Sequence, residues 1–232
     1  MIGIMNPSTA NLSDACHRLG IAIRHVPLSP LSPGMRVAGA VRPVIHRGSV
    51  DAFFAAMDIA SPGDVLVIDD RGRRDQACIG DLTALEAQAF GMAGIVVFGS
   101  HRDTADLRAI GLPVFSLGAC AVGPRALDAS VEAVLTITEN DVVFGDDDGV
   151  LFVGAADAER VIASARGIYE REHRQADLVR GGTSLHEQLR WPDPAATVEV
   201  REVNGGSTVQ NTPPQQQEQS SSACQQQRRG FG

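Results

Sequence analysis

The sequence contains no lysine, so all twenty of its basic residues are arginines. A chain without lysine cannot form a Schiff base with a carbonyl substrate, anchor pyridoxal phosphate or supply the lysine of a P-loop. Any carbonyl chemistry in this protein must therefore use a metal ion or another electrophile.

Other features are also scarce. No apolar run approaches 18 residues, and the first residues lack a basic stretch, so we expect neither a membrane span nor a secretory signal and predict a cytoplasmic protein. The four cysteines are scattered without a CxxC pair, which predicts neither a zinc site nor a disulfide framework. The net charge of −8 argues against a nucleic-acid partner, although it could attract an arginine-rich protein.

What is present favours a single α/β domain. The chain has 232 residues, 44% of them hydrophobic, with 24 glycines and few aromatic residues. Apolar strands are predicted at 65–68, 95–98 and 113–115, with helices at 80–90 and before Gly111. This alternation predicts parallel strands joined by right-handed crossovers.

The flanking segments predict a mixed sheet. Helices are expected at 8–20, 51–59 and 156–189, with a loop at 21–36. Ser8 or Thr9 can cap the first of these helices, and Gly20 ends it. A strand at 37–45 contains Pro43, which favours an edge or a bulge. Further strands are expected at 131–138 and 141–153, the latter around a solvated turn at Asp146-Asp147-Asp148-Gly149. We predict one domain over 1–190 and a disordered Gln/Ser-rich tail without function over 191–232.

Three short motifs could carry chemistry. Gly80, Asp81, Leu82 and Thr83 begin a predicted helix, where exposed amides favour an anion. Arg102-Asp103 follows a buried strand, and Asp106 lies one helical turn further on. Asp103 could ligate a hard cation directly, Asp81 and Asp106 could hold its waters, and Arg102 could grip a carboxylate. From the residues alone, an Arg-Asp surface pair and a simple helix cap remain alternatives. We interpret the neighbouring His101 as a loop residue and not as a ligand.

Several motifs together resemble the RraA-like family, which includes regulators of RNase E activity and 4-hydroxy-4-methyl-2-oxoglutarate/4-carboxy-4-hydroxy-2-oxoadipate aldolases. The resemblance covers about residues 8–190, and its motifs are STANLSDACHRLG, PGMRVAG, PGDVLVIDD, GDL, GMAGIVVFGSHRD, LRAIGLPVFS, DDDGVLFV and REHRQADLVRGGTSLHEQL. It implies an αββα-type sandwich of the phosphohistidine/swivelling-domain type, assembled as a trimer or a dimer of trimers, with sites between subunits.

The resemblance also implies roles for individual residues. The backbone of 80–83 and the side chain of Arg102 would bind a pyruvyl group, Asp103 would ligate Mg²⁺ or Mn²⁺, and Asp81 would orient a water for proton transfer. Asp106 fills the acidic position of the broader family, and Glu170 or Glu172 is a candidate for the acid donated by a neighbouring subunit.

The implied activity is retro-aldol cleavage of a 4-hydroxy-2-oxo acid to pyruvate, together with oxaloacetate decarboxylation through the same enolate. Regulators of RNase E lack the residue that matches Asp81, so its presence favours the enzyme. A non-catalytic regulator that binds an RNA-degrading enzyme remains the alternative. A methyltransferase is disfavoured because no glycine-rich methyl-donor loop follows the first strand.

Overall fold

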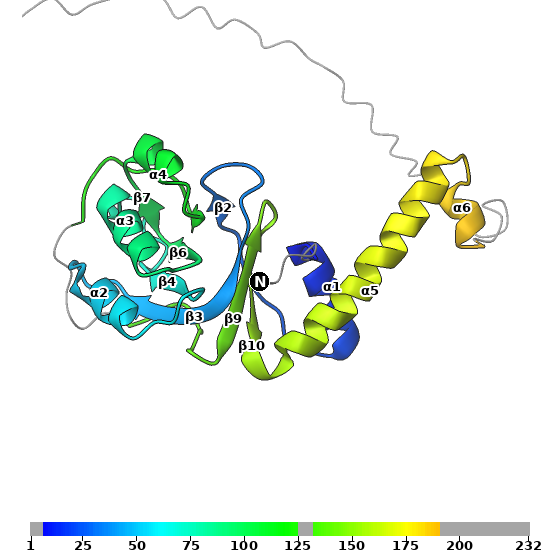
Figure 1. The fold of residues 1–232 in the computed structure, drawn as a ribbon, viewed down its shortest axis with the longest axis horizontal. Helices are drawn as coiled ribbons and strands as arrows, with labels where there is room; N and C mark the ends of the chain where they lie inside the picture. Colours follow the sequence, from blue (N-terminus) through cyan, green and yellow to red (C-terminus); the bar gives the residue numbers. More distant parts are fainter. Residues whose placement is uncertain (1–6, 125–131, 191–232) are drawn as a thin grey trace, which may run out of the picture. The chain divides into compact units, whose positions relative to one another are not determined.

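The computed structural model describes residues 7–124 and 132–190. Eight strands form one sheet in the order β1-β10-β9-β3-β4-β6-β8-β2, and β5 pairs with β7 beside it (Figure 1). The strands are β1 Arg24–Val26, β2 Ser29–Pro30, β3 Val37–Ile45, β4 Val65–Asp69, β5 Ala77–Ile79, β6 Gly94–Phe98, β7 Ser100–His101, β8 Val114–Ser116, β9 Asp141–Asp146 and β10 Gly149–Gly154. The helices are α1 Thr9–Leu19, α2 Asp51–Asp58, α3 Asp81–Ala89, α4 Thr104–Ile110, α5 Ala155–Arg180 and α6 Leu185–Gln188.

One half of the sheet is parallel. Strands β3, β4, β6 and β8 are neighbours in the parallel sense, as the alternation of strands and helices predicts. Every residue of β4 is buried, and successive side chains enter different cores. Leu66 and Ile68 pack in the core that also receives α2, α3 and α4, whereas Val65 and Val67 pack on the opposite face.

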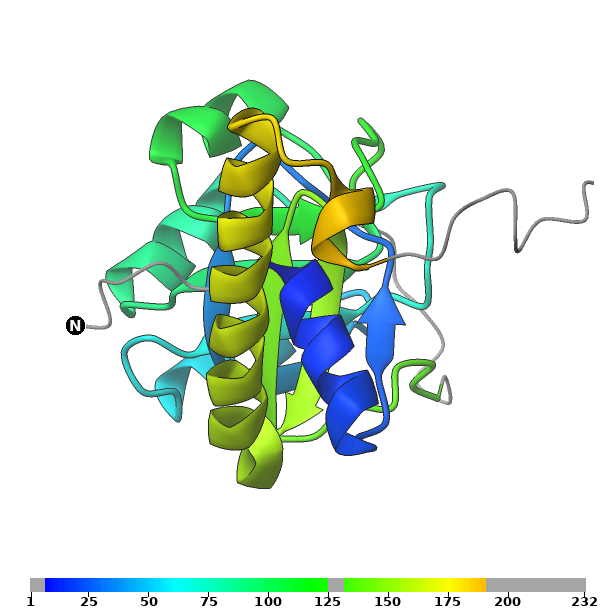
Figure 2. The same ribbon diagram turned by 90° about the vertical axis from the view of Figure 1, so that its right-hand side faces the viewer.

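The other half is antiparallel and folds back over the first. Val143 on β9 and Phe152 on β10 share a core with Val67 of β4, so the curled sheet encloses that core between its halves. On the outer face, Leu151 and Val153 pack with α1 and α5, which lie side by side in Figure 2. The layers are therefore helix, sheet, sheet and helix, which agrees with the predicted mixed α/β sandwich.

Strand β3 joins the two halves, and the edge predicted at Pro43 is confirmed only locally. The strand is central, because residues 37–40 pair with β9 and residues 41–45 pair with β4. Pro43 lies beyond the part paired with β9, so the ladder at that point has a partner only on the β4 side. At Pro43 no strand within the described residues pairs with β3 on the side where β9 pairs with residues 37–40, so the missing N–H of the proline is tolerated there. A proline can therefore occupy a strand that is an edge only locally.

Other boundaries also differ from the predictions. The expected loop at 21–36 contains the short strands β1 and β2, which pair with β10 and β8. Residues 132–138, expected to form a strand, have no regular structure, although Val134 N and Leu135 N donate to the carboxylate of Asp69. Hydrogen bonds to the Asp69 side chain thus take the place of the backbone hydrogen bonds that a paired strand would form. The pair β5-β7 was not predicted, because strands this short carry no periodicity.

Local chemistry explains the well-predicted ends. Ser8 caps α1 by accepting the amide of Asn11, and Gly20 ends that helix at φ 68°. The turn between β9 and β10 is also confirmed, but it is not fully solvated. Asp146 is buried and accepts from Thr9 N and Thr9 Oγ1 at 2.8 and 2.5 Å.

Within the described residues, no helix is long and apolar enough to cross a bilayer. Cys16, Cys78 and Cys120 are free thiols. The tail at 191–232 lies outside the described residues, so the division at residue 190 stays a prediction. The assignment to the swivelling-domain type also stays a prediction.

Candidate functional site

The predicted anion seat lines a pocket at the start of α3. Gly80 is the N-cap, Asp81 is the first helical residue, and no side chain caps this end. The Leu82 amide donates to Asp81 Oδ1 at 2.8 Å, which orients that carboxylate over the first turn. The pocket has a volume of about 480 Å³, and it is lined by Val50, Phe54, Gly80, Asp81, Leu82, Thr83, Leu85, Glu86 and Arg102. The structure therefore brings Arg102 to the residues that sequence analysis grouped with it.

The Arg102-Asp103 pair is held in place by backbone contacts. Arg102 N donates to Ile79 O at 3.0 Å, which fixes the segment after β7 beside the end of β5. Arg102 Nε lies 3.2 Å from Asp103 Oδ2, and both side chains are partly exposed. Asp103 has φ 57° and ψ 41°, a left-handed conformation that aspartate tolerates better than most residues. Such a backbone outlier is common where a side chain must be aimed.

Two glycines let these side chains approach the backbone. A Cβ built on Gly80 would collide with Asp103 Oδ2 and would lie 3.2 Å from Arg102 Nε. A Cβ on Gly123 would lie 2.8 Å from the Arg102 Nη1 atom. The guanidinium and the carboxylate therefore occupy space that any other residue at Gly80 would fill.

The remaining predicted residues surround this centre less closely. Asp81 is half-buried at the pocket wall, while Leu82 is 75% exposed at its rim. Thr83 is buried beneath the helix start. Asp106 is exposed in the first turn of α4, and it is not among the residues that line the pocket. It is the predicted site residue that the geometry supports least.

His101 is a buried strand residue and not part of a loop. Its Nδ1 lies 2.7 Å from Ser116 Oγ, and its Nε2 lies 3.1 Å from Thr104 Oγ1. Burial, and secondly the charge of Arg108, lower the pKa of His101. A neutral imidazole thus ties the first residue of α4 to the end of β8, directly beside Asp103.

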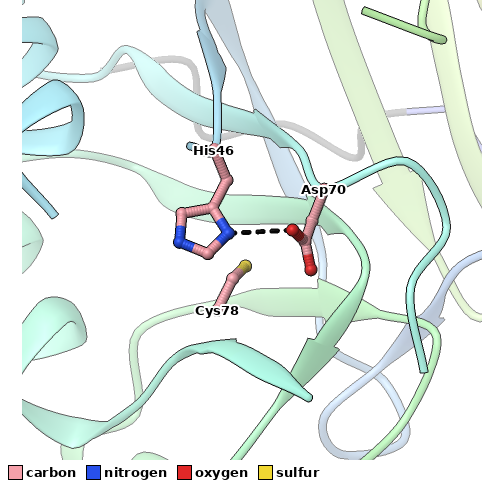
Figure 3. Close-up of side chains that lie close together, drawn as sticks. All are labelled: His46, Asp70 and Cys78. Atoms are coloured by element: carbon pink, nitrogen blue, oxygen red, sulfur yellow. Dashed lines mark hydrogen bonds and ion pairs between the residues drawn. The ribbon is translucent and has the colours of Figure 1, made fainter. Parts of the chain in front are cut away.

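Sequence analysis missed a second group of side chains near the same edge of the sheet. His46, Asp70 and Cys78 are all buried, and His46 Nδ1 lies 2.8 Å from Asp70 Oδ1 (Figure 3). Burial raises the pKa of the Cys78 thiol well above its usual value, and the charge of Asp70 adds to this. His46 and Asp70 directly follow β3 and β4, a position that could have identified them.

The pocket combines three chemical elements. A helix start and an arginine fork provide positive potential, carboxylates stand beside them, and Val50, Phe54 and Leu85 form apolar walls. This combination suits a small acid with one apolar part, with a cation held at the carboxylates.

Comparison with known proteins identifies related sequences. The family model described as RraA-like: Aldolase/RraA matches residues 9–152. A candidate 4-hydroxy-4-methyl-2-oxoglutarate aldolase of Halalkalibacterium halodurans is 32% identical over 146 residues, which are 60% of this chain and 70% of that protein. Protein DlpA of Legionella pneumophila is 30% identical over 200 residues, or 81% of this chain. The chain spans only 32% of the length of DlpA.

Solved structures share the fold. An uncharacterized protein from Pseudomonas syringae superposes with a TM-score of 0.68 at 29% identity, covering 79% of this chain and 92% of that one. RraAS2 of Streptomyces coelicolor, described as an unusual member of the RNase ES inhibitor RraA protein family, gives a TM-score of 0.59 at 28% identity. That match covers 72% of this chain and 89% of RraAS2.

Proposed function

Because this chain belongs to the RraA-like family, we propose that it is a divalent-metal-dependent aldolase that releases pyruvate. Its substrate would be 4-hydroxy-4-methyl-2-oxoglutarate or a related 4-hydroxy-2-oxo acid, and it would also decarboxylate oxaloacetate. The observation that carries the proposal is the packing of Arg102 and Asp103 against Gly80, at a pocket that Gly80, Asp81 and Arg102 line.

Arg102 and the start of α3 bind the acid end of the substrate. The guanidinium offers parallel N–H groups to a carboxylate, and the first amides of α3 add positive potential. Gly123 leaves room for Nη1, so the fork stays aimed at the pocket and is not displaced by a side chain. As C3–C4 cleavage moves electrons toward the keto oxygen, the same fixed charge stabilises the developing enolate.

The residues present fit a hard divalent cation such as Mg²⁺ or Mn²⁺. Asp103 presents a carboxylate oxygen above Gly80, in a space that a Cβ would fill. Asp103 would bind the cation directly, with Asp81 and Asp106 holding its waters, because Mg²⁺ commonly takes few protein carboxylates. When bound, the cation supplies Lewis-acid polarisation of the keto acid.

Asp81 acts in proton transfer. It is half-buried, and Leu82 N holds one of its oxygens at 2.8 Å, so its second oxygen is free to orient a water toward the C4 hydroxyl. Removal of that proton starts the cleavage of the C3–C4 bond. The proton later returns to C3 of the enolate to give pyruvate.

A neighbouring subunit would complete the site. The pocket rim is apolar and open, with Leu82 75%, Leu85 47% and Phe54 41% exposed. Within its own chain, Glu172 accepts from Asn11 Nδ2 at 2.7 Å, so this α5 carboxylate is already oriented on the outer face. A trimer or hexamer follows from the family resemblance, and light scattering at micromolar concentration is the measurement that checks it.

The test is pyruvate release from a panel of 4-hydroxy-2-oxo acids and oxaloacetate. EDTA should abolish release, and added Mg²⁺ or Mn²⁺ should restore it, because no lysine is available for a covalent route. Full activity in metal-free protein contradicts this mechanism. No release from any substrate contradicts the enzyme as a whole.

The alternative is a non-catalytic regulator. It is favoured by the likeness to RraAS2, which is described as belonging to an RNase ES inhibitor family, and by the net charge of −8. An acidic surface can bind an arginine-rich segment of an RNA-degrading enzyme. Binding of such a segment without pyruvate release would favour this alternative.

A further inference from the structure

Three buried side chains meet behind the pocket, and the proposed aldolase chemistry uses none of them. His46 follows β3, Asp70 follows β4, and Cys78 lies in β5. The exposed fractions of the three residues are 0%, 0% and 2%. One ligand atom from each residue lies within 4.8 Å of the other two. Figure 3 shows the Cys78 sulfur on the side of the imidazole that faces Asp70.

The hydrogen bonds within this group leave it incomplete. His46 Nδ1 pairs with Asp70 Oδ1 at 2.8 Å, but Asp70 Oδ2 and His46 Nε2 are buried and have no hydrogen-bond partner. A buried carboxylate oxygen without a donor destabilises the folded chain. Arg71 Nη2 lies 3.8 Å from Asp70 Oδ1, which makes an ion pair but no hydrogen bond, and Nη2 is itself buried without a hydrogen-bond partner. Asp70 Oδ2 therefore still lacks a donor or a metal ion.

The fold also leaves space for the carboxylate of Asp70. A Cβ on Gly99 would lie 2.8 Å from Asp70 Oδ2, so a glycine at this position is what admits that oxygen. The imidazole is held from its other side by Phe53, with ring centroids 5.5 Å apart. Packing therefore places the carboxylate and the imidazole close together.

We propose that His46, Asp70 and Cys78 form a binding site for Zn²⁺ or a similar borderline-soft divalent ion, separate from the cation at Asp103. A nitrogen, a carboxylate oxygen and a thiolate are the donor types that zinc takes, whereas Mg²⁺ and Mn²⁺ favour oxygen. The carboxylate and the thiolate balance the two charges of the ion. Asp70 Oδ2 or a water would supply the fourth donor.

The geometry requires only a small adjustment. With zinc–nitrogen and zinc–sulfur bonds of about 2.0–2.3 Å, neighbouring ligand atoms in a tetrahedral site lie roughly 3.3–3.8 Å apart. The observed 2.8 Å between Nδ1 and Oδ1 must open, and the other separations must close from at most 4.8 Å. Side-chain rotation covers shifts of this size.

Such an ion would support the pocket from behind. It would link the ends of β3, β4 and β5, and Cys78 stands two residues before Gly80. An ion that binds only the folded chain stabilises it in proportion to the logarithm of its concentration. Zinc at this site would therefore stabilise the position of the backbone at Gly80, whereas the reaction itself would require Mg²⁺ or Mn²⁺.

The experiment measures zinc bound to the full chain after chelation, reloading with Zn²⁺ and dialysis. We expect about one retained zinc per chain in wild type and in Asp103→Asn, and none in Cys78→Ala. The matched control is Cys16→Ala, which removes another buried thiol and should keep its zinc. Zinc that is lost in Asp103→Asn but kept in Cys78→Ala would overturn the proposal.

Cobalt provides a second readout if Cys78→Ala does not fold. Loading the variant Cys16→Ala/Cys120→Ala/Cys224→Ala with Co²⁺ should produce a thiolate-to-cobalt charge-transfer band, since Cys78 is then the only thiol. Absence of both the band and retained zinc would show that His46 and Asp70 are only a hydrogen-bonded pair. Neither readout uses catalysis. The test of the zinc site therefore stands even if the aldolase assay fails.

Discussion

The carboxylates of the two halves of the sheet are partnered differently, with the exception of Asp69 in β4, which accepts from Arg71 N, Val134 N and Leu135 N. In the antiparallel half, Asp141 accepts from Arg24 and from Thr138, and Asp146 accepts from Thr9 and from the amide of Asp148. At the carboxyl edge of the parallel half, Asp70 keeps an oxygen without a partner, and Asp103 has a left-handed backbone.

This difference separates the parts that stabilise the fold from the parts that are prepared for ligands. A carboxylate with all its donors satisfied lowers the free energy of the folded chain and is indifferent to solutes. A carboxylate that lacks a hydrogen-bond donor, or that a strained backbone holds in position, gains its partner only when a ligand binds. Substitutions at the parallel edge should therefore change activity, and those in the antiparallel half should change stability.

The largest effect is expected from Asp81→Asn. The amide keeps the shape of the side chain but loses the charge that steers proton transfer, so kcat should fall by about 10²–10⁴-fold. Substrate binding should change less, because the amides of α3 remain. Steady-state kinetics with a 4-hydroxy-2-oxo acid measure both quantities. Unchanged turnover would refute the role assigned to Asp81.

Arg102→Lys should follow with a loss in turnover of about 10²-fold or more, although the charge is kept. Lysine cannot reproduce the planar two-pronged grip on a carboxylate or an enolate. Arg108→Lys is a matched control, because that side chain is also exposed, and its guanidinium donates to the carbonyl of Leu31 and does not line the pocket. If both variants lose the same amount of turnover, the loss would be a general effect of replacing arginine by lysine and would not identify Arg102 as a site residue.

Gly80→Ala tests the close packing at the pocket. The backbone at φ −145° accepts alanine, but the added methyl collides with Asp103 Oδ2 and displaces it. A misplacement of this kind can cost about 10²-fold in activity. The control is Gly167→Ala in α5, where a Cβ meets nothing within 4 Å and should be neutral or slightly stabilising. If Gly80→Ala retains full activity, Asp103 need not occupy this space.

The smallest effect on activity is expected from Asp146→Asn, which should lower stability instead. The amide loses the charge that receives Thr9 N and Thr9 Oγ1, and its NH₂ group opposes those donors. We expect a loss of about 1–3 kcal/mol in the free energy of unfolding, measured by urea denaturation. Asp147→Asn is the control, since Asp147 is exposed and, among residues 7–124 and 132–190, accepts from Gly34 N alone. A large loss of turnover at unchanged stability would contradict the division between the halves.

Sequence patterns predicted the parts of this fold that local chemistry determines. The Ser8 cap, Gly20, and the continuous apolar runs of β4 and β6 mark elements that the structure confirms. The residues 80–83 and 102–103 were predicted to meet because they follow the carboxyl ends of strands or begin a helix.

Tertiary context decided the rest. Nothing local indicates that Asp69 will receive the amides of Val134 and Leu135 and so remove a predicted strand. Pro43 does mark a local edge, but the sequence does not reveal that two different strands share the length of β3 and make it central. His46, Asp70 and Cys78 escaped notice because their spacing is set by the sheet and not by a motif.

The shared strand β3 also constrains the order in which the molecule can assemble. The parallel half and its crossovers draw on chain from β2 to β8, whereas the antiparallel half needs β1 to pair with β10, at positions as distant as Arg24 and Phe152. During synthesis, the segment that carries the pocket is thus available before the strands that cover Val65 and Val67 on one face of β4. Until β9 pairs with residues 37–40, the apolar face of β4 that carries Val65 and Val67 is exposed to solvent. The antiparallel half therefore covers this face only at a late stage of folding.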